Sequence, residues 1–276
     1  MKVILQSLFL LCVTSQVIAG GKLLATSGVS QIEGSGGGGL VPWATISGYA
    51  TRDEVGASAF FSAVSVDDFR MSSYGASYAY KDRIEVSFAH QDFRSDDKTI
   101  KLSQDIAGFK LRLMGDVVFS YWPQIALGLQ YKDTNHAKTI SAFGAKNDQG
   151  IDFYLAATKA WLDGPLHRTF VLNTTLRYTK ANQIGLQGFG GDTKNEYKAL
   201  LEASAGFFLS RYWVLGAEYR QKPDQLSALK EDDWKNLFLA YFPNKNAAFT
   251  FALVDLGRLG GKGKQKGAYL SLQLAY

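Results

Sequence analysis

The chain has 276 residues, with 30 Lys and Arg against 25 Asp and Glu, and both signs are scattered along its length. A chain without a basic arm or basic helix is not a typical nucleic-acid-binding protein, so we expect no nucleic-acid partner. Aromatic residues make up 13% of the chain, and 28 glycines against 5 prolines favour strands and turns over helical bundles.

Residues 1–19 have the pattern of a cleaved signal peptide. Lys2 provides a short basic region, ILQSLFLLCV (4–13) is an apolar stretch, and small or tolerated residues at 17–19 precede a predicted cut before Gly20. The apolar stretch is too short for a membrane-spanning helix, which needs about 20 residues. Cys12 is the only cysteine, so the mature chain can form no disulfide and no thiolate metal site. We expect no cofactor and no metal.

The start of the mature chain allows two interpretations. KLLATSGVSQIE (22–33) can form a strand, GSGGGG (34–39) an outer turn, and Leu40 to Tyr49 a second strand. Alternatively, residues 20–39 lie inside a barrel as a plug.

Further along the chain, segments of about ten residues alternate apolar and polar side chains, which is the pattern of strands with two different faces. They include DRIEVSFAHQ (82–91), FKLRLMG (109–115), QIALGLQYK (124–132), TFVLNTTLRYT (169–179), WVLGAEYRQ (213–221) and the terminal GAYLSLQLAY (267–276). No uninterrupted apolar run after residue 20 is long enough for a transmembrane helix.

The connections between these segments alternate between short and long. Tight turns at 80–83, 163–168, 210–213 and 242–246 alternate with polar stretches at 94–99, 133–150, 180–195, 222–233 and 258–266. One tight rim and one elaborated rim are typical of an up-and-down antiparallel transmembrane β-barrel. Counting back from the C-terminus gives about 14 strands, or 12 if residues 20–39 are the plug.

A soluble β-sandwich or a lipocalin-like barrel would also alternate. Two features favour the membrane barrel. Aromatic residues gather near segment ends, as in interfacial girdles (Trp43, Tyr49, Tyr131, Trp161, Tyr178, Trp213, Tyr219 and Tyr276). Charged residues occupy the opposite, polar faces well inside the strands, where a dry core would leave them unpaired.

These inward charges are the candidate pore-lining residues. They are Glu85, Lys110, Arg112, Lys132, Arg177, Lys198, Glu202, Glu218 and Arg220. Six are basic and three acidic, so a water-filled lumen would weakly favour anions. In the alternative interpretation they pair across neighbouring strands and brace the wall.

The chain ends with Leu270, Leu272, Leu274 and Tyr276 on one face of the last segment. This arrangement resembles the C-terminal signal by which the outer-membrane assembly machinery recognises barrels. We therefore expect that machinery, outer-membrane lipid and lipopolysaccharide to be partners of the chain.

A hydrolase is the main enzymatic alternative, with His90 near Asp92 and with Ser87 three residues earlier. Nothing in the spacing demands such a site. The glycine clusters GFGGDT (188–193) and GRLGGKGK (257–264) lack a following helix that could hold a phosphate, and we interpret them as flexible loops.

Residues 20–49, 73–93, 102–116 and 122–132 resemble an uncharacterised family of Gram-negative outer-membrane proteins, domain of unknown function 3034. The resemblance covers essentially the whole mature chain, and it implies an exported outer-membrane barrel without naming a substrate. From the residues we expect a non-enzymatic, monomeric or weakly associating barrel that acts as a passive porin-like channel for small solutes. The alternatives are a structural or adhesion barrel with an occluded lumen and an enzyme that modifies membrane lipids.

Overall fold

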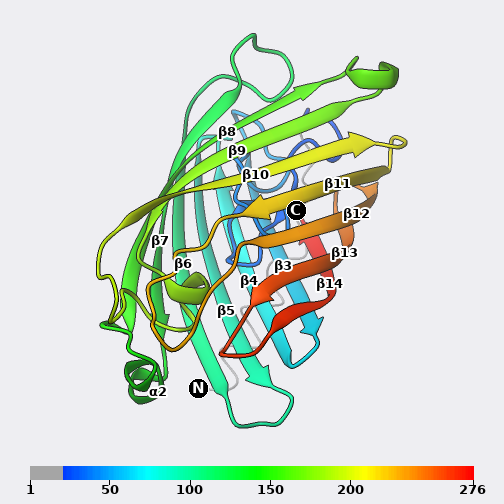
Figure 1. Ribbon diagram of the computed structural model, residues 1–276. Helices are drawn as coiled ribbons and strands as arrows, with labels where there is room; N and C mark the ends of the chain where they lie inside the picture. The colour runs from blue at the N-terminus through cyan, green and yellow to red at the C-terminus, as the bar shows by residue number, and fades with distance from the viewer. Residues whose placement is uncertain (1–20) are drawn as a thin grey trace, which may run out of the picture.

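The computed structural model describes residues 21–276, in which twelve strands form one closed antiparallel barrel (Figure 1). The wall strands are β3 (Val55–Val66), β4 (Phe69–Tyr80), β5 (Ile84–Ser95), β6 (Lys101–Met114), β7 (Gln124–Thr134), β8 (Gln149–Trp161), β9 (Phe170–Thr179), β10 (Lys198–Phe208), β11 (Trp213–Arg220), β12 (Trp234–Asn244), β13 (Ala247–Arg258) and β14 (Lys264–Ala275). Each strand pairs with the next, and β14 pairs with β3 to close the wall. The all-β barrel is thus confirmed, with twelve strands in its wall. The predicted signal peptide lies outside the described residues.

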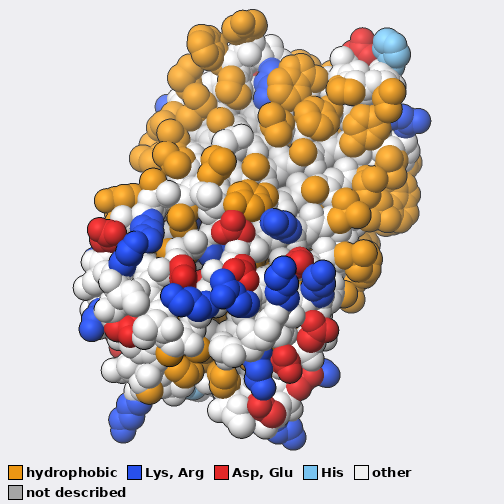
Figure 2. Space-filling view, in the orientation of Figure 1, with side chains coloured by type: hydrophobic (Ala, Val, Ile, Leu, Met, Phe, Trp, Pro, Cys, Tyr) orange, Lys and Arg blue, Asp and Glu red, His pale blue; other side chains and the backbone are white. Residues whose placement is uncertain are grey.

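The period-two pattern places apolar side chains on the outside of the wall. In β14, Leu270, Leu272 and Leu274 are 58%, 37% and 55% exposed, whereas Ser271 and Gln273 are buried inside the barrel. On the outer face seen in Figure 2, hydrophobic side chains cover the upper part, and charged ones gather toward the lower rim. An outward apolar band on a closed barrel is the arrangement of a transmembrane barrel.

The two rims differ as the connections predict. One rim has the turns 81–83, 115–123, 162–169, 209–212 and 245–246, with a short 3-10 helix η1 (Pro165–His167). The opposite rim, at the lower left in Figure 1, has the long connections 135–148, 180–197 and 221–233, which include α2 (Ala137–Ala142) and η2 (Asn182–Gly185). We call these the short-turn end and the long-loop end. Among the described residues, no helix is both long and apolar enough to cross a membrane.

Residues 21–50 lie within the barrel, where they appear in blue in Figure 1, and we call this segment the plug. Every residue from Ala25 to Ala50 is buried, and the plug's only ladder pairs β1 (Val29–Ser30) with β2 (Gly36–Gly37). The segment Leu40 to Tyr49 is therefore not a wall strand. Trp43 and Tyr49, at 4% and 6% exposure, lie inside the lumen and not in an interfacial girdle. The wall closes without these residues, so their apolar side chains are covered by it.

A second segment enters the lumen from the long-loop end. Residues 181–191, which we call the inner loop, are all buried. The expectation of a flexible loop at 188–193 is therefore wrong for its first four residues, because Gly188 to Gly191 pack inside the barrel. Apolar side chains of the wall and of the inner loop close this end together; they include Phe69, Phe93, Leu102, Leu186, Trp234 and Leu256.

Candidate functional site

Two of the predicted lining carboxylates hold the plug by its backbone. Glu85 accepts hydrogen bonds from the amides of Gly36 (2.9 Å) and Ser47 (2.8 Å). On the other side of the lumen, Glu218 accepts from the amides of Leu40 (2.9 Å) and Val41 (3.3 Å). The side chains of Ser204 and Asn236 also donate to Glu218. Both carboxylates therefore bind the backbone of the plug and do not line an open lumen.

Lys110 completes the contact on the Glu85 side. Its Nζ donates to the carbonyls of Gly36 (2.7 Å) and Thr45 (2.8 Å) and lies 3.2 Å from Glu85 Oε2. The side chain is fully buried. One lysine therefore satisfies two plug carbonyls and one wall carboxylate.

The glycine run 34–39 lets the plug approach these carboxylates closely. A Cβ at position 38 would lie 2.0 Å from Glu218 Oε1 and 2.9 Å from its Cδ. A side chain there would force the carboxylate or the plug backbone to move. The run is therefore explained by close approach of backbone to the wall, as is common for glycine beside a bound group.

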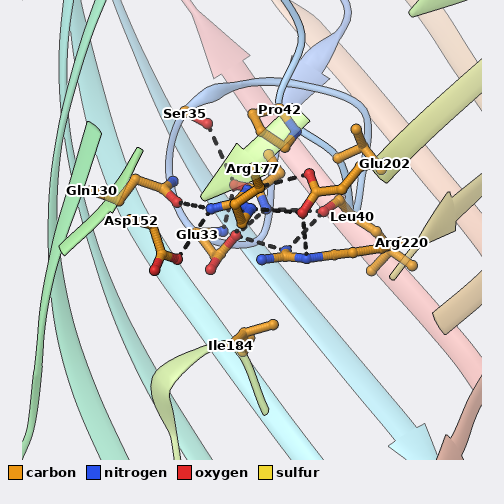
Figure 3. Close-up of polar contacts among 12 residues, drawn as sticks. Glu33, Ser35, Leu40, Pro42, Gln130, Asp152, Arg177, Ile184, Glu202 and Arg220 are labelled. Carbon is orange, nitrogen blue, oxygen red and sulfur yellow. Dashed lines mark hydrogen bonds and ion pairs between the residues drawn. The ribbon is translucent and has the colours of Figure 1, made fainter. Parts of the chain in front are cut away.

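Six charged side chains form a network inside the lumen, and its five wall members lie toward the long-loop ends of β7 to β11 (Figure 3). Its bases are Lys132, Arg177 and Arg220, and its acids are Asp152, Glu202 and the plug residue Glu33. Arg177 Nε lies 2.6 Å from Glu202 Oε1, and its Nη1 lies 3.2 Å from Asp152 Oδ2. Arg220 Nε lies 3.0 Å from the same Glu202 oxygen, and Lys132 Nζ lies 2.7 Å from Asp152 Oδ2.

Glu33 is the point at which the three bases converge. Its Oε1 contacts Lys132 Nζ, and its Oε2 lies 2.7 Å from Arg220 Nη1 and 3.5 Å from Arg177 Nη2. Burial by itself would raise the pKa of Glu33, but the charges of Arg220, Lys132 and Arg177 outweigh burial and hold the pKa well below its usual value. Glu33 is therefore ionised, and the network has three positive and three negative charges.

Lys132 also contacts the inner loop, so both internal segments meet at this side chain. Its Nζ donates to the carbonyl of Ile184 at 2.9 Å, and Gln104 Nε2 reaches the same oxygen at 3.4 Å. Ile184 has φ of +60°, which is strained for a β-branched residue. Figure 3 shows Ile184 on the other side of the network from the plug residues Ser35, Leu40 and Pro42.

The two remaining lining candidates lie apart from the network. Arg112 is at the short-turn end, where it contacts Asp82 and lies 3.2 Å from Asp116. Together with Lys22 these residues line a cavity of about 330 Å³. Lys198 begins β10 at the long-loop end and is half-buried, and it has no ion pair among the described residues. Eight of the nine candidates are thus buried, and they contact protein in place of an open lumen.

The serine and histidine considered for catalysis lie on opposite faces of β5. Ser87 is buried on the inner face, whereas His90 is on the outer face, with Nδ1 2.7 Å from Asp105 Oδ1 and Nε2 3.5 Å from Asp92 Oδ2. A spacing of three residues in a strand places side chains on opposite faces, so this pair cannot act as nucleophile and base.

Sequence reasoning missed two members of the network, Asp152 and Glu33. Asp152 could have been found, because Ile151 and Phe153 alternate with it as outward apolar residues. Glu33 gives no such signal, because the plug has no regular period and its place inside the barrel is set by contacts with distant strands.

The chain belongs to a family described as a protein of unknown function (DUF3034), whose model matches residues 26–273. No curated protein matches the sequence. Among solved structures, the chain is similar to a KdgM porin in complex with disordered oligogalacturonate, with 10% identity, coverage of 79% of this chain and 99% of that chain, and a TM-score of 0.51.

Two further structures are similar at lower TM-scores. The NanC porin has 8% identity, coverage of 80% of this chain and 99% of that chain, and a TM-score of 0.49. An outer membrane channel from Pseudomonas putida F1 has 11% identity, coverage of 86% and 96%, and a TM-score of 0.46. At these identities the similarity concerns the fold alone, which is that of a porin-like outer-membrane β-barrel.

Proposed function

We propose that the protein is a porin-like outer-membrane channel for small solutes, held closed by its own plug and inner loop. The observation that carries this proposal is a set of polar contacts between plug and wall, which lie beside an apolar cluster that both share. Glu85, Lys110 and Glu218 bind plug backbone, and Glu33 of the plug binds wall bases.

The physical reason is that a polar contact can be broken in water. Burying ion pairs costs desolvation, and apolar residues of similar volume would often stabilise the barrel as well or better. An apolar plug, however, could not leave a water-filled lumen without exposing apolar surface on both sides. Here the groups that meet at Glu85, Glu218 and Glu33 can be hydrated on both sides when the plug moves. The apolar contacts of Val29, Leu40 and Trp43 with the wall add to the cost of that movement.

A weak preference for anions belongs to the open state in this proposal. With the plug in place the central network is neutral. When Glu33 leaves, the network keeps the three bases Lys132, Arg177 and Arg220 and the two acids Asp152 and Glu202, which leaves one excess positive charge on the lumen wall.

Conductance in planar bilayers tests the proposal with one loosening variant and one matched control. Gly38→Ala places a Cβ against Glu218 and weakens the carboxylate's hold on Leu40 and Val41, whereas a Cβ at Gly263 meets nothing within 4 Å. We expect Gly38→Ala to conduct more often than the wild-type protein, with weak anion selectivity in a salt gradient, and Gly263→Ala to behave like wild type. A tight seal at all voltages for both wild type and Gly38→Ala would remove the channel proposal.

A structural or adhesion barrel with an occluded lumen is the second candidate. The complete burial of residues 25–50 and the apolar closure at the long-loop end favour it. A structural or adhesion barrel would give a tight seal at all voltages in the bilayer experiment, for both wild type and Gly38→Ala. We propose no enzymatic role, because the one serine and histidine pair considered lies on opposite faces of the wall.

A further inference from the structure

We infer that Glu33 occupies a binding site for a carboxylate-bearing solute, built by Lys132, Arg177 and Arg220 on the lumen wall. The inference deepens the proposed channel function, on which it rests for the idea that solutes reach this point. In the closed state the carboxylate of Glu33 fills this site, and a free carboxylate replaces it when the plug moves.

The geometry of the three bases supports a site for one carboxylate group. They come from β7, β9 and β11, and they approach the two oxygens of Glu33 from different sides. Their side chains are at most 3% exposed. Arginine presents a planar set of donors that matches a carboxylate, and the lysine adds a compact charge.

The arginines are held in place by wall groups that remain when the plug is absent. Glu202 holds both guanidinium groups, through Arg177 Nε at 2.6 Å and Arg220 Nε at 3.0 Å. Gln130 Oε1 accepts from Arg177 Nη1 at 2.8 Å, and the ring of Tyr154 lies 5.5 Å from the Arg177 guanidinium carbon. Arg220 Nη1 also donates to the plug carbonyl of Leu40 at 3.0 Å, whereas the wall contacts named above remain for both arginines when the plug is absent.

Charge balance gives the site its preference. Without Glu33, three bases are left with the two carboxylates Asp152 and Glu202, and this imbalance is buried where charge is weakly screened. One monovalent carboxylate restores neutrality, whereas a neutral molecule of the same shape does not. The site therefore takes small organic acids, or acidic groups carried on larger solutes, in preference to neutral ones.

Chemical rescue of Glu33→Ala tests the site without any measurement of conductance. This substitution removes the atoms that correspond to acetate, so acetate is the probe and acetamide is its neutral counterpart of similar shape. The readout is the melting temperature of the full chain in detergent micelles, at constant ionic strength and pH 7. Glu33→Gln is the matched control, because its amide fills the space that acetate would need.

We expect acetate to raise the melting temperature of Glu33→Ala by a few degrees in a concentration-dependent way, as binding of a ligand to the folded state does. Acetamide is expected to have no such effect, and acetate none on Glu33→Gln or wild type. If Glu33→Ala does not fold in chloride, the readout becomes its refolding yield in acetate against acetamide. Equal results with acetate and acetamide would overturn the inference. Failure of Gly38→Ala to conduct would instead contradict the channel proposal and leave the rescue result standing.

Discussion

Lys110→Met removes the ammonium group that contacts both Glu85 and the plug. The methionine side chain keeps much of the volume of the lysine stem, so the main change is the loss of the ammonium group. That loss leaves the buried Glu85 carboxylate without its ion-pair partner and removes one donor each from the carbonyls of Gly36 and Thr45. The contact between plug and wall should therefore weaken at this point.

The expected magnitude follows from the burial of the pair. Lys110 and Glu85 are 0% and 1% exposed, and breaking a buried ion pair by removing one partner typically costs about 3–5 kcal/mol. For a chain of this size, each kcal/mol lowers the melting temperature by roughly 2–4 °C. We therefore expect a decrease of roughly 6–20 °C for Lys110→Met, measured by thermal unfolding in detergent micelles.

Two controls distinguish the loss of the buried Lys110–Glu85 ion pair from the effect of replacing any lysine by methionine. Lys235→Met changes an exposed lysine on β12 and should leave the melting temperature close to that of wild type. Adding Glu85→Gln to Lys110→Met removes the uncompensated charge and should recover part of the loss, since contacting residues are coupled. A melting temperature for Lys110→Met equal to that of Lys235→Met would refute the reasoning, as would a double variant that loses the sum of the two single effects.

The remaining predictions concern the closing strand and a buried loop carboxyl. Leu272→Asp places a charge on the lipid-facing side of β14. We expect this variant, and deletion of Tyr276, to lower the amount of assembled barrel in outer membranes relative to the control Leu272→Val. Normal insertion of either variant would contradict the assembly role of this strand. In the loop 221–233, burial raises the pKa of Glu231 to about 8. The folded chain then holds a proton that the unfolded chain releases above about pH 4.5, so stability is lost as the pH rises toward 8. Glu231→Gln keeps an acceptor for the Gln183 amide and should flatten the decrease in melting temperature between pH 5 and pH 7; a decrease equal to that of wild type would argue against this assignment.

The wall of the barrel could be predicted from the sequence because its signal is local. In a strand, successive side chains point to opposite faces, so the alternation of Leu270, Leu272 and Leu274 with Ser271 and Gln273 fixes which side meets lipid. The same rule placed all nine charged candidates on the inward faces of the strands, and eight of them are buried in the structure. It would also have excluded the pairing of Ser87 with His90.

The partners of those inward charges could not be predicted in the same way. Glu218 and Leu40 are 178 residues apart, and Arg220 and Glu33 are 187 apart, so no spacing in the chain announces either contact. The excess of bases among the predicted lining residues suggested a wet, weakly anion-selective lumen. The structure adds Glu33 and Asp152 to the network, which makes it neutral while the plug is in place.

The sequence by itself thus determined the alternating faces of the wall, the two unequal rims and the lipid-facing closing strand, because each depends on neighbours within one or two residues. Only the tertiary structure decided that residues 21–50 fill the lumen, that the inner loop meets them at Lys132, and that the wall has twelve strands. The glycine-rich plug has no period of its own. Its position is fixed by backbone groups that bind side chains from strands far away in the sequence, and those contacts exist only once the barrel has closed.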